Sequence, residues 1–231
     1  MLIRQLFDPD TCTYTYLLWD QDSREAALID SVLEQVDRDE KLVRELNLDL
    51  RWLLETHIHA DHITGAGPLR DAFQGHAQVA VHDASQSGCA DILLHDGDVI
   101  KLGEQEIHVL YTPGHTDTDI SYLSGRTVFT GDTLLIRGSG RTDFQSGDPG
   151  KAYDSITQKL FTLPDNTVVY PAHDYNGLSI STIGEEKAVN PRLGGGATRE
   201  EYIKIMNDMD IPKPQRIDIA VPGNLKCGHN K

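Results

Sequence analysis

The sequence has 231 residues, of which 39% are hydrophobic and 25% charged, as in ordinary folded proteins, so a disordered or fibrous chain is excluded. Its formal charge of −15 repels nucleic acids and anionic membrane surfaces, and we expect neither as a partner. The chain is long enough to bury one sizeable core and has no Ser- or Pro-rich linker, so we predict a single domain over residues 1–231.

The N-terminal segment and the cysteines bear on the compartment. Residues 1–20 contain no apolar run long enough for a secretory signal or a membrane span, and no Arg-rich transit stretch. Cys12, Cys89 and Cys227 are too few and too scattered for a disulfide framework or a four-thiolate metal site. We therefore predict a cytoplasmic protein and interpret Cys227 as a packed thiol.

The first third of the chain predicts strands and helices in alternation. Apolar runs at residues 13–20 and 26–30 predict two strands, and apolar residues at helical spacing over 31–48 predict a helix. A strand at 51–56 then leads into HIHADHITGAG, after which 68–74 begins like a helix with proline in its first turn. A histidine cluster therefore lies on the loop between a strand and a helix.

The rest of the chain adds mostly strands. A helix is predicted over residues 151–163 because its apolar residues recur at helical spacing. Further strands are predicted at residues 77–82, 98–102, 105–112, 120–124, 127–132 and 167–173. This order predicts an α/β protein with two sheets facing each other and helices outside.

Four residues of the loop could bind a metal. They are His57, His59, Asp61 and His62, and each offers an imidazole nitrogen or a carboxylate oxygen. Side chains two apart on extended chain point the same way, so His57 and His59 can converge on one ion. Asp61 and His62 can then face a neighbouring position.

In three later segments, as in the histidine loop, a residue that could bind a metal lies where a predicted strand runs into a loop. They contain His115 in TPGHTDT, Asp132 in FTGDTLL and His173 in YPAHDYNG. Each has glycine or proline beside it, as sharp turns at a sheet edge require. Alone, each could be a solvated histidine or a turn aspartate, but together with the cluster they indicate a metal centre.

These motifs resemble the metallo-β-lactamase superfamily, in which HIHADH is followed by PGHT, TGD and a late strand-end histidine. The resemblance implies an αββα sandwich of two mixed β-sheets flanked by helices. Within the superfamily the sequence is similar to persulfide dioxygenases over nearly its whole length. GDTLLIRGSGRTDFQSGD, YPAHDYNG, EEKAVNPRL and KPQRIDIAVPGNLKCG carry that similarity.

The spacing and the resemblance imply different metal contents. By spacing alone, His57, His59 and His115 could hold one metal, and Asp61, His62 and His173 a second, with Asp132 bridging, as in a two-zinc hydrolase. The resemblance implies one Fe(II) per chain, held by His57, His115 and Asp132. His59, Asp61, His62 and His173 would then orient ligands and waters through hydrogen bonds.

The resemblance also implies the reaction and the substrate. Two imidazoles and one carboxylate leave open positions on ferrous iron for oxygen and substrate sulfur. Glutathione persulfide would be oxidised by O₂ and water to sulfite and glutathione, and relatives suggest a homodimer. Arg141 of GRTDFQ, Tyr175 of PAHDYN and Arg192 of NPRL match positions that contact glutathione, although Arg141 could instead pair with a nearby aspartate.

Two alternatives are open at this point. The first is a glyoxalase II-like thioester hydrolase with two metals, against which we note the short stretch after His173, residues 174–231, for a helical substrate domain. The second is a noncatalytic metal-binding or interaction protein, which the complete set of ligand-type residues disfavours. Metal content and oxygen uptake distinguish all three.

Overall fold

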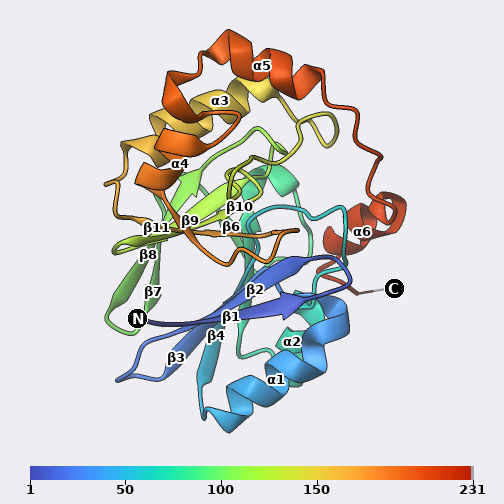
Figure 1. Cartoon of the computed structure of the whole chain (residues 1–231). Helices are drawn as coiled ribbons and strands as arrows, with labels where there is room; N and C mark the ends of the chain where they lie inside the picture. Colours follow the sequence, from blue (N-terminus) through green and yellow to red (C-terminus); the bar gives the residue numbers. More distant parts are fainter. Residues whose placement is uncertain (230–231) are drawn as a thin grey trace. The chain divides into compact units, whose positions relative to one another are not determined.

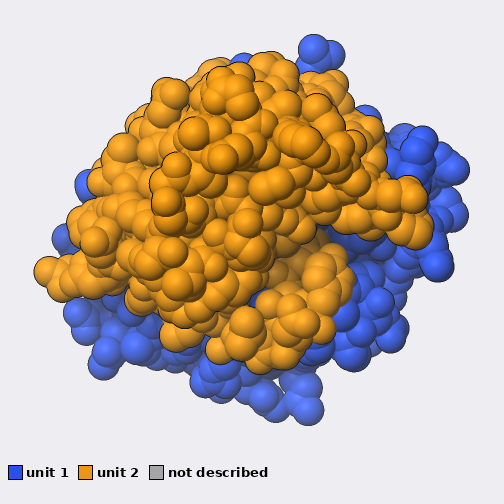
Figure 2. Space-filling view, turned by 45° about the horizontal axis from the view of Figure 1, so that its top comes forward, with its two compact units in different colours: residues 1–94, 99–107, 213–231 blue, residues 95–98, 108–212 orange. Residues whose placement is uncertain are grey.

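The computed structural model describes residues 1–229 and divides into two compact units (Figures 1 and 2). The first unit contains residues 1–94, 99–107 and 213–231, and the second contains residues 95–98 and 108–212. Among the described residues, no helix is long and apolar enough to cross a membrane. The prediction that residues 1–231 form a single domain stays a prediction.

The first sheet has six strands in the order β1-β2-β3-β4-β5-β6. β1 to β3 pair antiparallel and β3 to β6 pair parallel, so the sheet is mixed. The strands are β1 (Leu2–Asp8), β2 (Thr13–Trp19), β3 (Glu25–Ile29), β4 (Asp49–Leu54), β5 (Gln78–His82) and β6 (Ile92–Leu94). β2 is buried along its whole length, which explains its unbroken run of aromatic, aliphatic and threonine side chains.

Three helices belong to the first unit: α1 (Val36–Glu45), α2 (Ala66–Ala72) and α6 (Ile217–Asn224). Val43 of α1 and Leu69 of α2 join strand residues in one apolar cluster on the sheet. This packing buries the apolar faces of both helices, in agreement with the predicted arrangement of helices outside a sheet.

The second sheet has the order β12-β11-β10-β9-β8-β7 and is also mixed, because β10 pairs parallel with β11 while β8, β9 and β12 pair antiparallel with their neighbours. Its strands are β7 (Val99–Leu102), β8 (Gln105–Tyr111), β9 (Ile120–Ser124), β10 (Thr127–Gly131), β11 (Val168–Pro171) and β12 (Ser181–Thr182). The α/β class with two mixed sheets is therefore confirmed.

The helices of the second unit are α3 (Pro149–Gln158), α4 (Ile183–Val189) and α5 (Arg199–Asn207). α3 and α5 contribute Ile156 and Tyr202 to a second apolar cluster that also includes strand residues. Short 3₁₀ turns occur at Leu33–Gln35, Asp83–Ser85, Leu160–Thr162 and Gly194–Gly196. Each sheet thus carries helices packed on it.

The cysteines differ from the prediction. Cys89 and Cys227 form a disulfide with 5.9 Å between their Cα atoms, and Cys12 is a free thiol. Cys227 is buried in the first apolar cluster, as predicted, but it is disulfide-bonded and not a thiol. Sequence spacing could not reveal this pair because the two residues lie 138 positions apart.

Candidate metal centre

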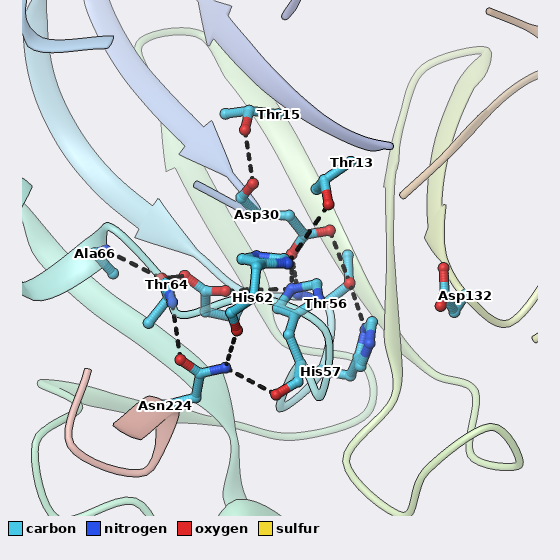
Figure 3. A network of polar contacts seen from close by, with 12 residues as sticks. Thr13, Thr15, Asp30, Thr56, His57, His62, Thr64, Ala66, Asp132 and Asn224 are labelled. Carbon is cyan, nitrogen blue, oxygen red and sulfur yellow. Dashed lines mark hydrogen bonds and ion pairs between the residues drawn. The ribbon is translucent and has the colours of Figure 1, made fainter. Parts of the chain in front are cut away.

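In the first unit, the loop after β4 carries His57, His59, Asp61 and His62, and all but Asp61 are buried. Figure 3 labels His57 and His62 of this loop. β3 and β4 pair parallel, so the residues that follow their carboxyl ends meet at one edge of the sheet. Asp30 follows β3 at this edge, next to the start of the loop.

Asp30 fixes the orientation of His57 through Thr56. Its carboxylate accepts hydrogen bonds from the Thr56 backbone N–H at 2.7 Å and from the Thr56 hydroxyl at 2.8 Å. Because the hydroxyl hydrogen is used in this way, Thr56 Oγ1 accepts from His57 Nδ1 at 3.0 Å. A neutral His57 therefore carries its lone pair on Nε2, as a metal ligand requires.

His59 lies between two carboxylates. Its Nε2 is 3.2 Å from Asp30 Oδ1 and 3.4 Å from Glu55 Oε2, and all three side chains are buried. Burial alone would lower the pKa of His59, but the charges and hydrogen bonds of Asp30 and Glu55 outweigh it and raise this pKa to about 10. Burial in turn raises the pKa of Glu55. The two carboxylates therefore favour the charged form of His59 in the metal-free protein.

His59, Asp61 and His62 form a group whose possible ligand atoms lie within 4.8 Å of one another. His62 Nδ1 donates to Asp61 Oδ2 at 2.9 Å. His62 Nε2 and His59 Nδ1 are buried with no hydrogen-bond partner among the described residues. Buried imidazole nitrogens without partners indicate that a ligand or an ordered water belongs beside them.

The second unit brings His115, Asp132 and His173 together. His115 Nδ1 donates to the Arg141 carbonyl at 2.7 Å, so a neutral His115 carries its lone pair on Nε2. That nitrogen is 3.6 Å from Asp132 Oδ2, a spacing that two ligands about 2.1 Å from one ion can adopt. His173 Nδ1 donates to the other carboxylate oxygen of Asp132 at 2.7 Å. One carboxylate oxygen is thus held by His173, and the other faces the His115 nitrogen.

Asp119 shapes the His115 loop from within the second unit. It is buried and accepts hydrogen bonds from the Thr116 backbone and hydroxyl, both at 2.7 Å. Burial raises the pKa of Asp119 to about 6, although the His115 charge and the Thr116 hydrogen bonds oppose this rise.

Arg141, one of the predicted substrate residues, is paired within its own unit. It donates to both carboxylate oxygens of Asp143 at 2.6 and 2.7 Å, and to the carbonyls of Ile211 and Pro212 at 2.8 and 2.6 Å. In the structure, Arg141 therefore pairs with a nearby aspartate, as in the alternative interpretation of the sequence. Bidentate binding of a substrate carboxylate by Arg141 would require Asp143 to move away.

The two other predicted substrate residues differ in exposure. The Tyr175 side chain is 71% exposed, and its ring lies parallel to that of His173 with 6.1 Å between centroids. Arg192 is half-buried, which lowers its pKa, and its guanidinium donates to the Ser139 carbonyl. Tyr175 is thus available to a ligand, whereas Arg192 also supports the backbone just before Arg141.

Asp30, Glu55, Asp119 and Asn224 are parts of the site that sequence reasoning missed. Asp30 directly follows a strand, which is the same signal that singled out the later ligand-type residues. Glu55 lies in the predicted strand just before the histidine loop, and Asp119 directly follows TPGHTDT. Asn224, which bonds the loop after β4, lies in a helix with an internal proline and gave no signal.

Comparison with known proteins identifies the relatives of this chain. The model of the metallo-beta-lactamase superfamily matches residues 12–173. The mitochondrial persulfide dioxygenase ETHE1 of Mus musculus is 49% identical over 99% of this chain and 89% of its own length. A probable metallo-hydrolase of Burkholderia pseudomallei is 33% identical over 99% of this chain and 93% of its own.

A solved structure is also similar over almost the whole chain. The crystal structure of ETHE1 from Myxococcus xanthus matches with a TM-score of 0.96 at 53% identity, covering 99% of this chain and 100% of that one.

Proposed function

The chain belongs to the metallo-β-lactamase superfamily and has its fold. Within this superfamily, we propose that it is a persulfide dioxygenase. The reaction would convert glutathione persulfide, O₂ and water into glutathione, sulfite and two protons. A metal cofactor fits both the family and the grouped His and Asp side chains. The proposal rests on likeness to persulfide dioxygenases over nearly the full chain, together with the arrangement of the candidate ligands.

One observation carries the assignment of ligands. His57 and His115 each have Nδ1 engaged as a donor, so each presents Nε2, and Asp132 has one oxygen held by His173. As the resemblance implies, we propose that His57, His115 and Asp132 hold one ferrous ion per chain. Two imidazoles and one carboxylate are the donor set typical of non-haem iron oxygenases, so the residues fit the metal. Bound iron would supply the electron-transfer chemistry and open coordination positions that reaction of a persulfide with O₂ needs.

The neighbouring residues would tune this centre. His173 keeps Asp132 in one orientation, and the chain from Asp30 through Thr56 does the same for His57. His59 Nε2 faces Asp30 and Glu55, so His59 would anchor the ligand loop to these two buried carboxylates. Asp61 and His62 would orient ordered water beside the ligand loop.

The substrate proposal follows from charge. Glutathione is anionic and must approach a chain of formal charge −15, so fixed cations are needed to bind it. Arg141 and Arg192 are the proposed cations, and the exposed Tyr175 ring is the proposed contact for the tripeptide backbone. For Arg141, binding means exchanging the Asp143 carboxylate for a substrate carboxylate, which keeps the guanidinium paired in both states.

The remaining parts of the proposal concern assembly and location. We assign residues 1–231 to one functional domain and expect a homodimer. A cytoplasmic location is also kept as a prediction. The Cys89–Cys227 disulfide is the observation against it, because disulfides persist mainly in oxidising compartments.

A second candidate is a two-metal thioester hydrolase related to glyoxalase II. The group of His59, Asp61 and His62, with two buried nitrogens that lack partners among residues 1–229, favours it. Asp30 and Glu55 face His59 Nε2 and leave Nδ1 open, so this geometry does not decide between the two functions, whereas the likeness to persulfide dioxygenases over nearly the full chain favours one iron. The one-iron function is therefore the better supported of the two.

Three variants test the ligand assignment. Asp132→Ala and His115→Ala should each lose iron and all turnover, since each removes a proposed ligand. His62→Ala should keep one iron per chain and lose only part of its turnover. Full iron content and activity in Asp132→Ala would contradict the assignment. A fall from two metals to one in His62→Ala would replace it with the hydrolase.

A further inference from the structure

The loop from His57 to Thr64 has buried backbone groups that no helix or strand satisfies. One side chain, that of Asn224 at the end of α6, serves three of them (Figure 3). Its Nδ2 donates to the His59 carbonyl at 2.8 Å and to the His62 carbonyl at 2.9 Å, and its Oδ1 accepts from the Thr64 backbone N–H at 2.8 Å. Asn224 is 3% exposed, so water does not compete for these bonds.

We propose that Asn224 is a positioning residue that holds this ligand loop in its metal-binding shape. The inference rests on the proposed function only in taking His57 as a ligand. All three of these hydrogen bonds go to backbone groups, so Asn224 acts through the backbone of the loop.

The geometry explains why an asparagine is needed. The two carbonyls that it binds are three residues apart, so joining them to one amide closes the loop into a tight turn. A carboxamide offers two N–H donors and an acceptor at one point. Aspartate has the same shape but no donor, and it would set a negative oxygen against the two carbonyls.

The two ends of the loop are thus fixed by different parts of the first unit. At the start, Asp30 binds Thr56 immediately before His57. At the end, Asn224 binds His62 and Thr64. Hydrogen bonds at both ends therefore fix the backbone of the loop segment that carries the histidines.

α6 is itself attached beside the loop. The Gly67 backbone N–H donates to the Cys227 carbonyl at 2.8 Å, and an added Cβ at Gly67 would lie 2.4 Å from that oxygen. Cys227 is also joined to Cys89 by the disulfide. These attachments follow Asn224 by three residues, so they fix the helix end from which its side chain reaches the loop.

The test compares Asn224→Asp and Asn224→Ala with Val43→Ala. Val43 is fully buried in the apolar core of the same unit, and its side chain cannot form hydrogen bonds with the loop. Its variant therefore controls for a general loss of stability. We measure the rate at which a chelator removes iron, the spectrum of the ferrous nitric oxide complex, and kcat and KM after iron is restored.

Both Asn224 variants should lose iron at least about tenfold faster than wild type, in line with the effect of residues that support metal ligands. Their nitrosyl spectra should broaden, and kcat should fall while KM stays within about twofold. Val43→Ala should lower the melting temperature but leave these readouts near wild type. Asn224 variants that match Val43→Ala in iron release and spectrum would overturn the proposal.

Two further measurements keep the outcome distinct. If the Asn224 variants do not fold, Cys89→Ser is used instead, because it keeps Asn224 but removes the disulfide that holds the end of α6. This variant should also release iron faster than wild type. An unchanged rate of release would overturn the proposal. Wild-type protein is assayed first, because a failure to hold iron or consume O₂ contradicts the proposed function and not the role of Asn224. A wild type that holds zinc is tested by its zinc release in the same way.

Discussion

Replacing Asp30 with asparagine should destabilise the protein and loosen its metal site together. Asp30 accepts from the Thr56 backbone, the Thr56 hydroxyl and His59, and it is 1% exposed. In Asp30→Asn, Oδ1 can still accept from the Thr56 backbone and from His59, but an amide nitrogen in the place of Oδ2 cannot accept from the Thr56 hydroxyl. The His59 imidazolium then keeps only Glu55 as a buried counter-charge.

The size of the loss follows from the broken ion pair. Removing one partner of a buried pair costs about 3–5 kcal/mol. For a protein of this length, each 1 kcal/mol shifts the melting temperature by about 2–4 °C, so the expected fall is about 6–20 °C. Because the hydrogen bond that orients His57 passes through Thr56, iron should also dissociate faster.

Thermal unfolding of metal-free protein measures the first effect and chelator competition measures the second. Asp49→Asn is the control, since the Asp49 side chain is 44% exposed and pairs only at the surface with Arg51 and His76, so its loss should cost less than about 1 kcal/mol. If Asp30→Asn melted within about 1 °C of wild type, the reasoning about this network would be refuted.

Three other predictions address substrate, pH and the disulfide. Arg141→Ala should raise KM about tenfold or more with kcat within about threefold, as steady-state oxygen uptake can show; an unchanged KM would remove Arg141 from the substrate site. In metal-free protein, the raised His59 pKa adds stability that is complete below the unfolded value of 6.5 and is lost as pH rises through about 10. Unfolding free energies across this range and NMR titration of His59 test this, and titration near 6.5 would contradict it. Reducing the Cys89–Cys227 disulfide, which spans 138 residues, should cost up to about 5 kcal/mol in urea unfolding, while Cys12→Ser costs little; equal stability with and without reductant would argue against the pair.

Hydrophobic patterning predicted the strands and helices that have a clear apolar run or apolar residues at helical spacing. The runs at 13–20, 51–56 and 77–82 became β2, β4 and β5. The helix predicted at 31–48 is shorter, since it begins with a 3₁₀ turn and α1 ends at Glu45.

Elements without a clear pattern were missed. β1, β6, β12, α4, α5 and α6 were not predicted. α5 has a capping box between Thr198 and Glu201 that could have revealed it. α6 contains Pro222, which normally argues against a helix interior.

The candidate site was predictable where ligand-type residues follow strands, because strand ends gather at a sheet edge. This reasoning identified His57, His115 and Asp132, but it could not assign their partners. Hydrogen bonds such as those of Asn224 join residues 160 or more positions apart, and only the folded chain brings them together. The choice between one iron and two zincs came from the resemblance and not from the spacing.

The most direct test of the account is the metal content and oxygen uptake of protein purified without air. We predict one iron per chain, and O₂ consumed only when glutathione persulfide is present, with one sulfite formed per O₂. Two zinc ions per chain, with thioester cleavage and no oxygen uptake, would contradict the account.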